Sequence, residues 1–85
     1  MISVVVSVKD SAAEAFGRPM YVQSVGVAIR AFTDEVNRED KENQMYQHPD
    51  DFDLYELGVF DDSTGIHEFR DNPSVLLRGK DVKIK

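Results

Sequence analysis

The sequence predicts an α+β fold, in which a small antiparallel sheet of four or five strands packs against one main amphipathic helix. Several short segments rich in β-branched and aromatic residues alternate between apolar and polar positions, as strands do. Only the segment from Val25 to about Arg38 has the apolar spacing of a long helix. The elements follow in the order β-β-α-β-β, and we expect residues 1–85 to form a single domain.

The first strand is predicted where apolar β-branched residues occupy every second position from Ile2 to Val8. The small residues of Ser11–Ala15 are typical of a flexible connection, and Phe16-Gly17-Arg18-Pro19 is typical of a turn. Met20-Tyr21-Val22 is then expected to form a short second strand.

The helix is predicted to begin after Ser24, because a serine at this position can cap the first free backbone N–H groups. The polar run Glu39–Gln44 is expected to end the helix or to form a loop. Four apolar residues share one stripe of the helix and Ala28 lies beside it, so this stripe should face the sheet. They are Val25, Ile29, Phe32 and Val36.

A turn is expected at His48-Pro49-Asp50-Asp51, because the residue before a proline avoids helical backbone angles. The third strand is predicted from Phe52 to Phe60. Asp61–Gly65 is expected to be a hairpin loop with its glycine in a left-handed conformation, and Ile66–Arg70 to return as the fourth strand. In the last segment, which starts at Asn72-Pro73-Ser74, a helical turn is predicted at Val75–Leu77 and an edge strand at Val82–Ile84.

The third strand carries apolar groups on both faces, which one helix cannot cover. Strict alternation places Phe52, Leu54 and Phe60 on one face, and it places Tyr55, Leu57 and Val59 on the other. The second face must therefore meet the C-terminal segment, a ligand or another copy of the chain. Of these alternatives we expect a homodimer.

Composition narrows the class of protein. There are no cysteines, so disulfides and thiolate metal sites cannot supplement a small core. The longest apolar runs are too short to span a bilayer, and the first residues lack the features of a signal peptide. We therefore expect a soluble intracellular protein that makes no membrane contact.

The net charge of −6 opposes nonspecific attraction to phosphate, and the charges are unevenly distributed. Residues 34–62 hold eleven acids against Arg38 and Lys41, a balance of −9. Residues 70–85 hold five bases against Asp71 and Asp81, a balance of +3. Binding to nucleic acid must therefore depend on a local basic face.

No motif indicates an enzyme. The chain has no nucleophilic cysteine, no G-x-S-x-G elbow and no phosphate-binding glycine loop, and nothing pairs two acids at a defined site. His48, Asp50, Asp51 and Asp53 offer metal ligands but lack the calcium-loop pattern, so a solvated turn is expected there. We expect no catalytic residue, no metal and no cofactor.

The most specific run of the chain is Tyr46–Asp61, with the pattern Tyr-x-His-Pro-x-Asp-Phe-x-Leu-Tyr-x-Leu-Gly. Together with Ala28–Phe32 and Val36-Asn37, it resembles the small nonstructural protein of gokushoviruses, which are microviruses with circular single-stranded DNA genomes. The resemblance extends from about Met20 to Phe69, over half of the chain. It implies a nonenzymatic accessory in the host cytoplasm, described as DNA-binding or as favouring single-strand synthesis and packaging.

Single-stranded DNA binding requires cations along the backbone and exposed aromatic rings on which bases stack. Tyr21, Tyr46, Tyr55 and Phe69 are the aromatic candidates. The predicted basic–aromatic face comprises Arg18, Tyr21, Arg30, Phe69, Arg70, Arg78, Lys80, Lys83 and Lys85.

Each of these residues also has a structural interpretation. A core or a dimer interface accounts better for any single aromatic ring, because a core this small needs its aromatic residues. The tail lysines fit a protected edge strand, and Arg30 fits a solvated position or an ion pair with Asp34. The acidic stretch 34–62 supports an alternative function, an adaptor that recruits phage replication or procapsid proteins without contacting DNA.

Overall fold

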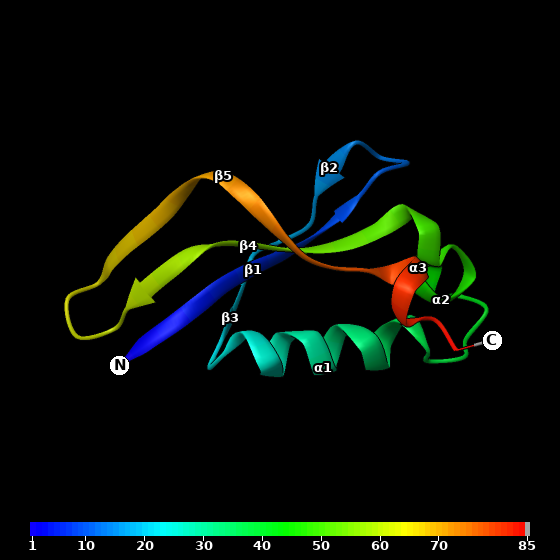
Figure 1. The fold of residues 1–85 in the computed structure, drawn as a ribbon, viewed down its shortest axis with the longest axis horizontal. Coiled ribbons are helices and arrows are strands. Elements are labelled where there is room, and N and C mark those ends of the chain that lie inside the picture. Colours follow the sequence, from blue (N-terminus) through cyan, green and yellow to red (C-terminus); the bar gives the residue numbers. More distant parts are fainter. Residues whose placement is uncertain (85) are drawn as a thin grey trace.

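One antiparallel sheet and one twelve-residue helix make up most of the molecule (Figure 1). The structure, a computed structural model, describes residues 1–84. Its strands are β1 (Ile2–Asp10), β2 (Ala15–Phe16), β3 (Met20–Val22), β4 (Phe52–Asp61) and β5 (Ile66–Arg78). Its helices are α1 (Val25–Val36), α2 (Gln44–Gln47), the 3-10 turn η1 (Pro49–Asp51) and α3 (Gly79–Val82). The predicted α+β class and the antiparallel sheet are confirmed.

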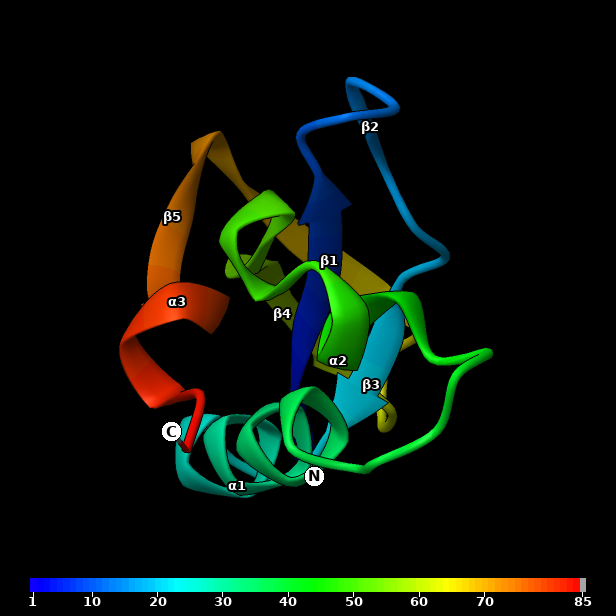
Figure 2. The same cartoon turned by 90° about the vertical axis from the view of Figure 1, so that its right-hand side faces the viewer.

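The sheet has the order β2-β1-β4-β5, and β3 lies beside β2 along the same edge of β1. Strand β2 pairs with Lys9 and Asp10, whereas β3 pairs with the segment Val4–Val6. Figure 2 shows β2 and β5 rising on the side away from α1, so the sheet is curled. This curl leaves Val5 and Ser7, both on the side away from α1, at 1% and 0% exposure.

Helix α1 begins where the sequence predicts. The Ser24 hydroxyl accepts the backbone N–H of Val27 at 3.2 Å, which satisfies one of the free donors of the first turn. The helix ends at Val36, two residues before the predicted end, because Asn37 caps it. The Asn37 side chain also donates to the carbonyl of Val82 at 2.9 Å, which ties the end of α1 to α3.

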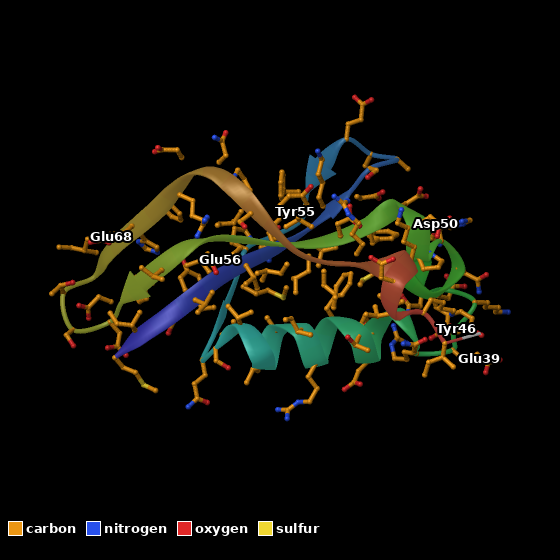
Figure 3. All side chains as sticks on the ribbon, viewed as in Figure 1. Glu39, Tyr46, Asp50, Tyr55, Glu56 and Glu68 are labelled. Carbon is orange, nitrogen blue, oxygen red and sulfur yellow. The ribbon has the colours of Figure 1, made fainter. Side chains whose placement is uncertain are left out.

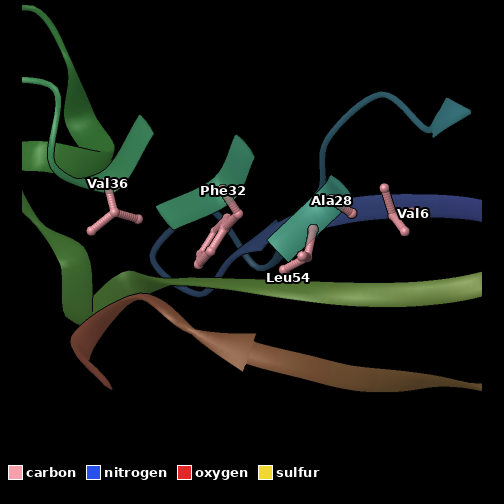
Figure 4. Packing of buried hydrophobic residues seen from close by; sticks show 5 residues of the cluster. All are labelled: Val6, Ala28, Phe32, Val36 and Leu54. Atoms are coloured by element: carbon pink, nitrogen blue, oxygen red, sulfur yellow. The ribbon is translucent and has the colours of Figure 1, made fainter. Parts of the chain in front are cut away.

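The core lies between α1 and one face of the sheet (Figure 4). Three residues of the predicted helix stripe, or beside it, are buried against two strand residues. These five residues are Val6, Ala28, Phe32, Val36 and Leu54, each at most 4% exposed. Burying large apolar side chains of this kind contributes about 1.5–3 kcal/mol each, so this layer holds the helix on the sheet.

The C-terminal segment differs from the prediction. Val75–Leu77 belongs to β5 and forms no helical turn, because Leu77 pairs with Leu54 on the neighbouring strand. Val82–Ile84 forms no edge strand, since the chain turns into α3 at Gly79. A Cβ atom on Gly79 would lie 2.3 Å from the carbonyl oxygen of Pro49, so only glycine allows α3 to pack this closely on η1.

A β-bulge interrupts the pairing of β4 with β1. Val5 pairs with Gly58, but the next residue of β1, Val6, pairs with Glu56. Leu57 is therefore the extra residue, and it shifts the alternation of side chains along the rest of β4.

The bulge reverses the predicted faces of two residues. Phe60 pairs with Ser3 and lies on the face away from α1, whereas it was expected beside Leu54. Val59 pairs with Val4, which packs against the core, so Val59 lies on the α1 side. The strict alternation assumed from the sequence is wrong at these positions, because an unpaired residue moves all later side chains to the other face.

Within residues 1–84, none of the helices combines the length and the apolar character needed to cross a membrane.

Candidate nucleic-acid interface

The sheet face turned away from α1, called the outer face, gathers most of the aromatic side chains of the strands. Strand pairing identifies its members, because paired residues point to the same side of an antiparallel sheet. Figure 3 shows one of them, Tyr55, on this side of the sheet. The aromatic and charged members of the outer face are Lys9, Phe16, Tyr21, Asp53, Tyr55, Phe60, His67, Phe69 and Arg78.

Four of these side chains form a continuous row across β3, β4 and β5, called the aromatic strip: Tyr21, Phe60, His67 and Phe69. The ring centroids of Tyr21 and Phe60 lie 5.5 Å apart, edge to face, and those of Phe60 and His67 lie 4.5 Å apart. His67 and Phe69 stack at 5.2 Å with 13° between their planes. The Tyr21 hydroxyl is 2.8 Å from Nε2 of His67, so a hydrogen bond closes the row.

The two end residues of the aromatic strip remain accessible. Tyr21 is 53% exposed and Phe69 is 62% exposed. Neighbouring rings hold each of them in place, so little side-chain freedom remains to be lost when a planar ligand stacks on it. The strip is thus a preformed surface on which a planar group can stack.

A second aromatic pair lies at the other end of the outer face. Phe16 and Tyr55 contact each other edge to face at 5.2 Å between centroids. The Lys9 ammonium is 5.6 Å from the centroid of the Phe16 ring, within the range of a cation–π interaction. Lys9 therefore places a positive charge beside the aromatic surface formed by Phe16 and Tyr55.

Negative charge is nearly excluded from the outer face. Among the residues positioned by strand pairing, its charged side chains are Lys9, Arg78 and Asp53. Arg78 donates to the Asp53 carboxylate at 2.7 Å, which compensates that charge. The other carboxylates positioned by strand pairing face the α1 side: Asp10, Glu56, Asp61 and Glu68. The outer face is therefore slightly positive on a protein whose net charge is −6.

The structure separates several of the predicted cations from the aromatic strip. Arg70 binds Glu56 at 3.0 Å, and that carboxylate belongs to the α1 side of the sheet. Arg30 is exposed on α1, which covers the opposite face from the strip. Arg18 is exposed in the connection that leads into β3, and Tyr21 lies on that strand.

The tail lysines take different positions. The Lys83 ammonium donates to the Tyr46 carbonyl at 3.2 Å and lies 3.1 Å from the centroid of the Tyr46 ring. Lys83 therefore ties the tail to α2, and it covers an aromatic ring that was expected to be a stacking platform. Lys80 is exposed in α3, and Lys85 lies outside the described residues.

Of the predicted face, the structure thus brings Tyr21 and Phe69 together, with Arg78 on the same side of the sheet. His67 lies two positions before Phe69, so strand periodicity alone indicates a shared face. The aromatic and basic residues of the outer face that were not predicted from the sequence are Lys9, Phe16, Phe60 and His67. Apart from His67, their places on this face depend on pairing between distant strands or on the bulge.

No curated protein matches the chain, and no solved structure does. A family model, described as Phage ORF5 protein, matches residues 3–82. The match covers the chain from β1 through α3, including every strand of the outer face. The chain therefore belongs to the Phage ORF5 protein family.

Proposed function

We propose that this phage protein is a nonenzymatic accessory of a single-stranded DNA phage of the gokushovirus type, acting in the host cytoplasm in genome replication and packaging. Its role there is to bind single-stranded DNA through the outer face of the sheet. The observation that carries the proposal is the aromatic strip, a preformed row of rings with exposed residues at both ends.

Stacking supplies the main attraction in this proposal. A base stacked on an aromatic side chain contributes about 1–3 kcal/mol, and the contact tolerates any base because every base has a planar face. Tyr21 and Phe69 offer exposed rings for such contacts. Bases paired in a duplex keep these faces covered, which favours single strands.

Contacts between cations and phosphate groups supply a smaller part of the attraction for DNA. Two cations for which residues 1–84 show no ion pair belong to the outer face or to the segment next to it: Lys9, beside Phe16, and Arg18, just before β3. Neutralising two phosphates of a single strand gives a slope of about −1.4 for log affinity against log salt. Affinity should therefore be only moderately sensitive to salt.

The test is fluorescence anisotropy of a labelled oligothymidylate across a salt series. Y21A and F69A should each weaken binding about 5- to 150-fold, which corresponds to one lost stacking contact. The control I84A removes an apolar side chain of 75% exposure away from the strip and should bind like the wild type.

The salt dependence of binding distinguishes cations that contact phosphate from cations that do not. K9A combined with R18A should flatten the salt slope, whereas R30A, which removes an exposed charge from α1, should leave it unchanged. Absence of binding at low salt, or equal losses for I84A and F69A, would exclude the outer face as a DNA site.

The second candidate is the acidic adaptor for phage replication or procapsid proteins. It is favoured by the end of α1 and the connection after it, where Asp34, Glu39, Asp40 and Glu42 are all exposed. Such a surface complements a basic partner. A protein that binds no oligonucleotide, but binds a basic phage protein in a salt-sensitive manner lost in E39K/E42K, would establish the adaptor instead.

A further inference from the structure

Strand β5 forms one edge of the sheet, and residues 1–84 place no strand along its outer side. Every residue from Ile66 to Arg70 is exposed. Figure 1 shows that this half of β5 extends, with the hairpin, beyond the N-terminal end of α1. An exposed edge of this kind presents unpaired backbone N–H and C=O groups that can pair with another strand.

The part of β5 available for pairing has a natural centre. Gly65 ends it on one side, because the left-handed φ of 75° turns the chain into the hairpin loop. Pro73 ends it on the other, since proline has no N–H to donate to a neighbouring strand. Phe69 lies midway between these two residues.

The charges around this centre are self-complementary. When two copies of β5 run antiparallel with Phe69 opposite Phe69, Glu68 of each copy faces Arg70 of the other, so that this arginine lies between the partner's Glu68 and its own ion-pair partner Glu56. A shift of the pairing by two residues in either direction instead places Glu68 opposite Glu68, or Arg70 opposite Arg70, which is unfavourable.

We propose that the protein forms a symmetric homodimer in which the two β5 strands pair antiparallel about Phe69. The same patch serves both subunits, as in a two-fold interface. The sheet then continues from one copy into the other, and the exposed Phe69 of each copy gains a neighbour of the same kind. The homodimer predicted from the two apolar faces of the third strand is thereby formed through the edge of the sheet.

Pairing along an edge leaves both outer faces open. The two aromatic strips become neighbours across the symmetry axis, and the second copy extends the stacking surface of the first. The dimer does not depend on DNA binding, so the oligomeric state tests it independently of the proposed function.

The first test is charge reversal, measured by sedimentation velocity over a concentration series. The wild type should be a dimer, and E68R and R70E should each weaken dimerisation at least tenfold, because like charges then face each other. An equimolar mixture of the two variants should form a heterodimer, since every facing pair is again of opposite charge. The controls E39R and R30E make the same charge changes at exposed positions away from the edge and should dimerise like the wild type.

The second test uses the absence of cysteine from the chain. Residue 69 faces itself across the axis, so F69C should form a disulfide-linked dimer on mild oxidation. I84C, with its cysteine exposed elsewhere, should remain uncrosslinked. A monomeric wild type, a dimer unaffected by both E68R and R70E, or an F69C variant that does not crosslink would each refute the proposed interface.

Discussion

Adding one methyl group at Gly58 tests how closely the two longest strands approach each other. Gly58 lies opposite Phe69, and a Cβ atom there would sit 2.2 Å from the carbonyl oxygen of Glu68 and 2.8 Å from the Cα of Phe69. Both contacts are with backbone, so no side-chain rotation relieves them. Strand β5 would have to retreat by roughly 1 Å to restore ordinary contact distances.

Overpacking of this kind costs about 1–3 kcal/mol, and we expect Gly58→Ala to reach the upper end because a whole strand must move. Domains have about 0.05–0.15 kcal/mol of stability per residue, which gives roughly 4–13 kcal/mol for this chain. The variant should therefore lose a large fraction of its unfolding free energy.

The assay is urea unfolding followed by far-UV circular dichroism. Gly26→Ala is the matched control, because Gly26 lies exposed in α1 and its added Cβ meets only the Ser24 hydroxyl oxygen, at 3.9 Å. Alanine favours helix over glycine, so this control should gain about 0.5–1 kcal/mol. A Gly58→Ala variant as stable as the wild type would show that the close approach of β5 to β4 is not required.

Three further predictions concern the helix, the tail and the acidic connection. Ser24→Ala removes the cap of α1 and should lower the unfolding free energy by about 1 kcal/mol in urea titrations, whereas Ser24→Thr should be nearly neutral. Lys83→Met removes the cation over Tyr46 and should lower the free energy of unfolding by about 1–2 kcal/mol. It should leave the salt slope of oligonucleotide binding unchanged. A flatter slope would instead identify Lys83 as a phosphate contact. The backbone N–H of Glu42, followed by the Arg38 side chain, lowers the pKa of the Asp40 carboxyl from its usual 3.8. The ionised Asp40 carboxylate therefore stabilises the folded state above pH 3.8, and this contribution is lost as the pH falls through the lower pKa of the folded state. Asp40→Asn should remove this part of the acid dependence of stability. NMR titration of Asp40 should show the lowered pKa directly.

Elements with strong local signals were predicted correctly. Alternating β-branched residues defined β1, Ser24 marked the start of α1, and Gly65 adopts the expected left-handed conformation in the hairpin. Each of these features depends on neighbours within a few positions along the chain. The hairpin turn and β4 therefore required no knowledge of the rest of the fold, whereas β5 continues to Arg78, beyond the predicted end of the fourth strand at Arg70.

Elements that depend on distant partners were predicted less well. Leu76 and Leu77 suit a helical turn or a strand equally, and their position beside β4 decides for the strand. The bulge at Leu57 arises from the register between β1 and β4, which no local pattern reveals. One extra residue there was enough to move Phe60 from the expected core face to the aromatic strip.

In the candidate site, too, features with local signals were predicted and features that depend on distant partners were not. Tyr21 and Phe69 were selected from the sequence because aromatic residues stand near basic ones there, and both are exposed on the outer face. The cations were harder to assign, because a charge is available to a ligand only when no partner compensates it. Arg70 and Arg78 meet carboxylates contributed by β4, and these partners lie far away in the sequence.

By itself, the sequence determined the fold class, the position of the main helix and the strands that carry Tyr21, Tyr55 and Phe69, because short-range periodicity and capping govern these features; it predicted a turn at Phe16, which lies on β2. Only the tertiary structure decided which rings share a face, which cations are neutralised and which strand edge stays open. These properties arise from pairing between residues far apart in the chain, where the register and its shifts, between β1 and β4 and between β4 and β5, set the direction of the side chains.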